Sequence, residues 1–159
     1  MNRRSCIALA TLAFAAFTVG CGDDASATWL AQVRAAHASA DATRDVAVAE
    51  RALREAFERE VPTGVAHEDA RVVRQDLAYR LASIALEDDR AEDARGYADR
   101  GLALGAATDV FTANLYVVRG QAREALGDAV GAAGDYHEAL IVNEALLDRV
   151  LDPSPEEER

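Results

Sequence analysis

The sequence predicts an all-α protein built as three antiparallel helical hairpins. Hydrophobic residues make up 50% of the 159-residue chain and aromatic residues only 6%, so a core must come mainly from Ala, Leu and Val. Ala and Leu are strong helix formers. Apolar residues recur three and four positions apart along much of the chain, which is the spacing of one helix face. Gly, Pro and Asp interrupt these runs and divide them into three pairs.

The first pair is predicted over residues 28–39 and 42–60. Both segments carry apolar residues at helical spacing. Asp41 is the predicted N-cap of the second helix, because an Asp side chain can accept hydrogen bonds from the free N–H groups of a first turn. The Pro and Gly of residues 61–64 end that helix.

The second pair is predicted over residues 67–87 and 90–104. Asp89, followed three residues later by Glu92, resembles a capping box at the start of the second helix. Gly105 marks the end of the pair.

The third pair is predicted over residues 108–126 and 128–150. Between its helices, Gly127 suits the left-handed position after a helix and Asp128 suits the next N-cap. Residues 151–159 contain two Pro and three Glu, which predicts an extended acidic tail.

The N-terminus has the features of a bacterial export signal. Arg3 and Arg4 precede an apolar run over residues 6–19, which is too short to span a bilayer comfortably. Gly20 and Cys21 follow it, and this ending resembles a lipoprotein lipobox. The resemblance implies a signal peptide over residues 1–20 and a Cys21 that carries a diacylglycerol.

The alternatives to a lipoprotein are a secreted protein with a free Cys21 thiol and an uncleaved membrane anchor. A lipidated chain is attached through a short polar tether, residues 21–27. Gly22, rather than Asp, follows Cys21, so the resemblance implies the outer membrane, with the protein facing the periplasm. Asp23, one position later, leaves the inner membrane as the alternative location.

A second resemblance comes from the third pair of helices. Tyr116, Gly120, Ala132, Tyr136 and Ala139 have the spacing of a tetratricopeptide repeat (TPR), in which small residues lie where two helices touch and aromatic rings fill the gaps beside them. The resemblance implies a short TPR-like right-handed solenoid over residues 28–150. Arg119 departs from the pattern, since the family prefers Leu there.

The second pair of helices fits the repeat pattern less closely, and the first pair only suggests it. A helical bundle without repeats is therefore the alternative architecture. In tetratricopeptide arrays the first helix of each hairpin lines a concave groove that binds a partner. The residues that this resemblance assigns to such a groove are Asp76, Tyr79, Ser83, Leu86, Asn114, Val117, Gln121 and Glu124.

Nothing in the sequence predicts catalysis, a cofactor or a metal site. His37, His67 and His137 lie in three different hairpins and none has a second His or Cys at metal-binding spacing. The acidic run over residues 88–92 lacks the Gly and Glu positions of a calcium loop and is interpreted as a turn.

The formal net charge is −11, and losing Arg3 and Arg4 with the signal peptide takes it to −13, which disfavours nucleic acid as a partner.

The sequence therefore predicts a membrane-anchored adaptor that binds another protein or peptide of the bacterial cell envelope. Two alternatives remain. One is a structural lipoprotein that self-associates through its hairpin ends. The other is a protein that binds a small ligand or a cell-wall fragment in the groove.

Overall fold

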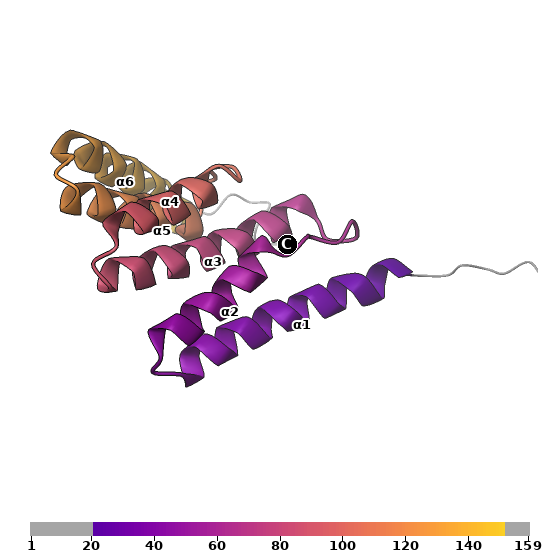
Figure 1. Cartoon of the computed structure of the whole chain (residues 1–159). Helices are drawn as coiled ribbons and strands as arrows, with labels where there is room; N and C mark the ends of the chain where they lie inside the picture. The colour runs from indigo at the N-terminus through magenta and orange to yellow at the C-terminus, as the bar shows by residue number, and fades with distance from the viewer. Residues whose placement is uncertain (1–20, 152–159) are drawn as a thin grey trace, which may run out of the picture.

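The structure, a computed structural model, describes the backbone of residues 21–151 and the side chains of residues 24–151. These residues form six helices and no strand, which confirms the all-α prediction (Figure 1). The predicted signal peptide, residues 1–20, and the tail from residue 152 onward lie outside the described residues. The helices are α1 (Cys21–Ala42), α2 (Val46–Glu58), α3 (His67–Glu87), α4 (Ala91–Leu102), α5 (Val110–Ala125) and α6 (Ala129–Leu151).

The predicted bounds of the last five helices differ from the observed ones by no more than four residues. The first helix differs more, because α1 begins at Cys21 instead of Thr28. Residues 21–27, expected as an extended tether, therefore form its first turns. Asp24 favours this outcome, since an acidic side chain stabilises the positive end of a helix dipole. A helix rises only about 1.5 Å per residue, so this segment reaches less than half as far as an extended chain.

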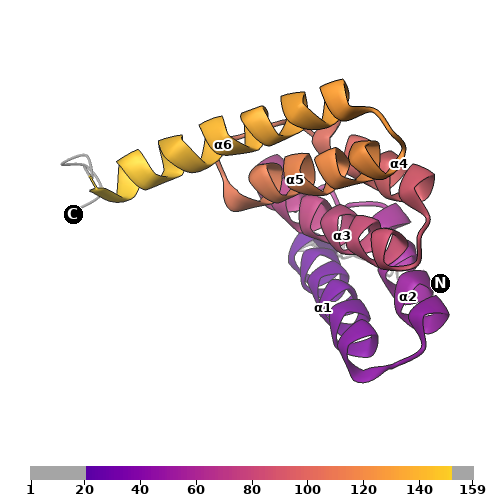
Figure 2. The ribbon, with the colours of Figure 1, turned by 90° about the vertical axis from the view of Figure 1, so that its left-hand side faces the viewer.

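Consecutive helices pack as hairpins: α1 with α2, α3 with α4, and α5 with α6. The second and third hairpins are joined most closely, because α5 contacts both α3 and α4. The first hairpin is attached differently. Only α2 approaches the backbone of α3, and within the described chain α1 makes no close backbone contact with α3. Figure 2 shows the α1–α2 turn projecting away from the other helices.

Side-chain caps define several helix ends. Asp109 accepts from Thr112 N at 2.8 Å and opens α5. At the turn between α5 and α6, Gly127 has φ of 82° and Asp128 Oδ1 accepts from Gly131 N at 2.9 Å, which confirms the predicted stop and start.

Two predicted caps are wrong. Asp41 lies inside α1, and Asp45 caps α2 by accepting from Ala47 N and Val48 N. Asp89 does not cap α4. It has φ of 55° and belongs to the end of α3, where Arg90 N donates to Ala85 O at 2.8 Å. This is the left-handed C′ position that Gly usually fills and that Asp can tolerate.

Small residues permit close packing between the hairpins. A Cβ atom on Gly101 of α4 would lie 2.8 Å from Leu115 of α5 and 2.9 Å from Ala78 of α3. In the third hairpin, Gly120 of α5 lies directly beneath the ring of Tyr136 of α6. The core continues through Leu77 and Leu81 of α3 to the first hairpin, where its buried members are Trp29, Val33, Ala40, Ala49, Leu53, Ala56 and Phe57.

Candidate functional site

The four candidate groove residues of α3 form one stripe along that helix, since they are spaced three and four apart. Asp76 and Ser83 are partly exposed, whereas Tyr79 and Leu86 are half-buried against the core. Ser83 Oγ donates to the carbonyl oxygen of Tyr79 at 3.0 Å. The stripe therefore offers the edges of two apolar side chains, since its carboxylate, Asp76, faces His37 of α1.

The four candidate residues of α5 form a second stripe. Asn114 and Val117 are half-buried, and Gln121 and Glu124 are exposed. Glu124 is not free for a partner, because Tyr136 Oη of α6 donates to its Oε2 at 2.9 Å. Burial and this hydrogen bond raise the pKa of Tyr136. Since α3 and α5 contact each other, the structure places the two stripes on adjacent helices.

Ionic side chains connect α1 with the stripe on α3. His37 Nε2 lies 3.5 Å from Asp76 Oδ2, and Arg80 Nη1 lies 2.6 Å from His37 Nδ1. Arg80 also pairs with Asp41. A guanidinium can only donate, so His37 Nδ1 is the acceptor and the ring proton lies on Nε2, facing Asp76. Burial lowers the pKa of His37 below its ordinary value of 6.5, although Asp76 opposes this.

A buried ion cluster holds α5 to α6, and the sequence did not reveal it. Asp135 is only 2% exposed and accepts from Arg119 Nη2 at 2.6 Å and from Arg123 Nη1 at 2.9 Å. Arg119 also donates to Asp99 of α4 at 2.9 Å. Arg119, the departure from the repeat pattern, is thus compensated by a carboxylate on the facing helix. The available signal was an Asp at an inward position of α6.

A second polar cluster fixes the loop between α4 and α5. Gln75 of α3 is fully buried and its Nε2 donates to the carbonyl oxygens of Gly101 at 3.3 Å and Gly105 at 2.8 Å. Arg71 bonds to Gln75 and to Asp109. Burial opposes ionisation of Asp109, but hydrogen bonds from Thr112 and Arg71 outweigh it and lower the pKa of Asp109. Gln75, Arg71 and Asp109 all find their hydrogen-bond partners within the fold, so the cluster serves to hold the α4–α5 loop on α3.

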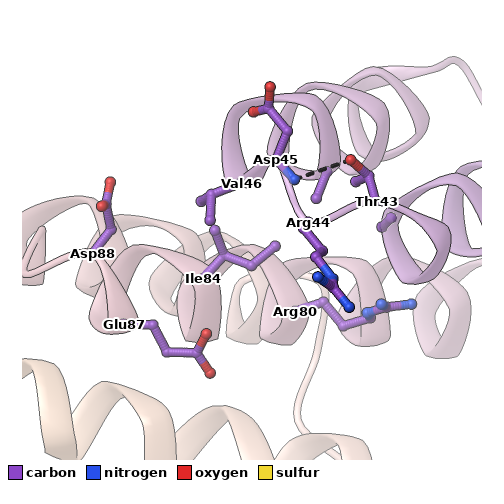
Figure 3. Close-up of a pocket in the computed structure, with 10 residues that line it drawn as sticks. Thr43, Arg44, Asp45, Val46, Arg80, Ile84, Glu87 and Asp88 are labelled. Atoms are coloured by element: carbon purple, nitrogen blue, oxygen red, sulfur yellow. Dashed lines mark hydrogen bonds between the residues drawn. The ribbon is translucent and has the colours of Figure 1, made fainter.

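A hollow of about 330 Å³ lies between the α1–α2 turn and the last turns of α3 (Figure 3). Val46 and Ile84 supply an apolar wall, and Arg44 points toward α3, where Arg80 lies. Asp45, Glu87 and Asp88 lie in the same lining as the two Arg residues, so the hollow favours no charge on a ligand. None of the eight candidate groove residues lines it.

The described part of the chain contains no cluster of three or more His, Cys, Asp or Glu side chains that could hold a metal ion. His37, His67 and His137 lie on α1, α3 and α6. Residues 88–90 form the turn between α3 and α4, whereas Ala91 and Glu92, expected in the turn, already belong to α4. The backbone of Cys21 begins α1, but its side chain lies outside the described residues.

Among the helices described, none has the length and apolar character needed to cross a membrane. Fold and surface together define an all-helical protein of antiparallel hairpins. Comparison with known proteins finds no matching family model and no curated protein with a matching sequence.

Proposed function

We propose that this protein is a lipid-anchored adaptor that binds another protein or peptide of the bacterial cell envelope. The observation that carries the proposal is the direct packing of α3 against α5. It places the two stripes on adjacent helices. On α5 it leaves Asn114, Val117 and Gln121 at the surface, with no ion pair or hydrogen bond from their side chains to the rest of the described chain. Partly apolar, partly polar surfaces on rigid helices suit recognition of a peptide or a helix.

The proposed architecture is a short TPR-like right-handed solenoid of three hairpins. It is supported by the order of contacts, in which α5 packs on both helices of the preceding hairpin. It is also supported by Gly120 beneath the ring of Tyr136, where the repeat pattern calls for a small residue facing an aromatic one. The first hairpin departs from this order, because α1 does not approach the backbone of α3.

The proposed anchor is a lipid on Cys21, after removal of residues 1–20, in the outer membrane and facing the periplasm. It is supported by the lipobox-like ending of the apolar run. A single-thiol mature chain follows from this proposal, since Cys6 leaves with the signal peptide. Several acyl chains hold firmly, at roughly 0.8 kcal/mol per buried methylene.

The test is crosslinking of the full chain, tagged after Arg159, in intact cells, with the captured proteins identified. The variant is Gln121→Arg, which places a long cation on the α5 stripe. Gln32→Arg is its matched control, because Gln32 is an exposed Gln on α1. We expect one envelope protein to be captured by the wild type and by Gln32→Arg and lost with Gln121→Arg. Equal capture by both variants would show that the α5 stripe is not the surface that binds the partner.

A further inference from the structure

One half-buried guanidinium has no counter-charge. Arg74 of α3 forms no ion pair with any carboxylate of the described chain, and its Nε is buried without a hydrogen-bond partner. Its guanidinium lies over the ring of Phe57 of α2, 5.3 Å from the centroid. All other buried or half-buried Arg side chains of the described chain pair with a carboxylate; they are Arg71, Arg80, Arg90, Arg95, Arg119 and Arg123. In a chain with 28 acidic and 17 basic residues, this exception points to a bound anion.

Arg74 lines a hollow whose polar side chains are all basic. The hollow has a volume of about 280 Å³ and lies between the α2–α3 loop, the first turns of α3 and the residues that follow α4. Its polar lining consists of Arg74, Arg71 and His67, and no carboxylate lines it. Its remaining lining is apolar and consists of Val61, Val65, Ala70 and Leu104.

The carboxylates near this hollow are directed elsewhere. Glu68 and Asp109 both pair with Arg71, so Arg71 is already compensated and Arg74 supplies the unmatched charge. The two acidic residues in the first turn of α3 are exposed to solvent, which screens them. Arg100 of α4 lies over the same Phe57 ring as Arg74, at 4.5 Å, and an exposed glutamate of α2 is 3.6 Å from it. A second cation therefore lies on the inner side of the hollow.

We propose that this hollow binds a small organic carboxylate. The carboxylate group pairs with Arg74, whose planar guanidinium matches it in shape, and the hydrocarbon body packs against the apolar lining. Inorganic phosphate fits less well, because apolar walls cannot replace the water that it loses. An amino acid fits less well too, because its ammonium group would meet basic side chains only. The proposal does not rest on the adaptor function, since none of the eight candidate groove residues lines this hollow.

The first test is isothermal titration calorimetry of the detergent-purified full chain with 4-methylpentanoate. Three further probes each change one feature: 4-methylpentanamide removes the charge, leucine adds an ammonium group, and inorganic phosphate removes the hydrocarbon. We expect the acid to bind and the amide to bind at least about 10-fold more weakly, because a hydrogen bond to a charged group is lost. Leucine and phosphate should also bind more weakly than the acid. No binding of the acid, or binding of any other probe as tight as that of the acid, would overturn the proposal.

The second test places the carboxylate at Arg74. Arg74→Met removes the charge and keeps an unbranched apolar chain beside Phe57, and Arg74→Lys keeps a charge without the planar group. Arg100→Met is the matched control, because Arg100 lies over the same ring and does not line the hollow.

We expect Arg74→Met to weaken binding of the acid by about 10-fold or more, and Arg74→Lys to weaken it less. Arg100→Met should change it by no more than about twofold, since the charge of this exposed side chain is screened. Far-ultraviolet circular dichroism checks that each variant is folded. Equal losses in the two Met variants, or Arg74→Lys binding no better than Arg74→Met, would show that Arg74 does not hold the carboxylate.

Discussion

Close packing at Gly101 leads to a specific prediction about stability. α4 contains two Gly residues in different surroundings. Gly101 is buried, whereas Gly96 is exposed, and a methyl group added to it would have no atom within 4 Å. Replacing either residue by Ala reduces the conformational freedom of the unfolded chain and favours the helix by about 0.5–1 kcal/mol. This gain is common to both variants, so their difference reports the packing.

The added methyl at Gly101 would meet Leu115 at 2.8 Å and Ala78 at 2.9 Å, whereas carbon atoms in contact prefer about 3.5–4.0 Å. Leu115 and Ala78 are both fully buried and cannot move into solvent. Overpacking of this kind costs about 1–3 kcal/mol. We therefore expect Gly96→Ala to raise the free energy of unfolding by about 0.5–1 kcal/mol, and Gly101→Ala to be about 1–3 kcal/mol less stable than Gly96→Ala.

The assay is urea unfolding followed by far-ultraviolet circular dichroism, with both variants and the wild type fitted for midpoint and slope. A shift in midpoint at constant slope reports stability alone. Equal stability of Gly101→Ala and Gly96→Ala would refute the reasoning, because it would mean that α3, α4 and α5 do not meet at Gly101.

Three further predictions concern the ion clusters and the anchor. Asp135→Asn should lower the free energy of unfolding by about 2–3 kcal/mol in the same urea assay, because it leaves two guanidinium groups without their shared charge, and no loss would contradict the cluster. The lowered pKa of His37 means that the unfolded chain binds a proton more readily than the folded one. The stability that the wild type gains over His37→Asn should therefore be greatest above about pH 6.5 and should fall as the pH drops below it, and a difference independent of pH would count against this. Cys21→Ser should move the chain from the membrane to the soluble fraction, while an unchanged distribution and an unchanged mass would exclude the lipid.

Much of the fold could be predicted because each helix carries its own periodic apolar pattern and its own end signals. Gly127 and Asp128 are an example, since each fits one role only. The wrong caps show the limit of this reasoning. Asp suits an N-cap through its carboxylate and also tolerates a left-handed backbone, so Asp89 fits the start of α4 and the end of α3 equally well by sequence. The hydrogen bonds of the finished turn decide between them.

The ion clusters could not be predicted, because they depend on the register of neighbouring helices. Arg119 and Asp135 are 16 residues apart, and only the length and geometry of the α5–α6 turn bring them into contact. The candidate groove residues have a related difficulty. A stripe on one helix is visible in the sequence, but the sequence does not show which of its members interact with neighbouring helices. Glu124 accepts a hydrogen bond from α6, and Asp76 faces His37 of α1.

The attachment of the first hairpin has a consequence for an anchored protein. α1 begins at the proposed lipid site, and its ion pairs with α3 come from the side chains of His37 and Asp41, while its Trp29 joins the same buried core as α3. Such partly exposed ion pairs contribute at most about 1 kcal/mol each. The core contacts between hairpins, which include Leu53 of α2 and Leu77 of α3, are fully buried. Because only α2 approaches the backbone of α3 and buried apolar packing is stronger than a partly exposed ion pair, we expect the α2–α3 contact to contribute most to how the two stripes are oriented relative to an anchor at Cys21.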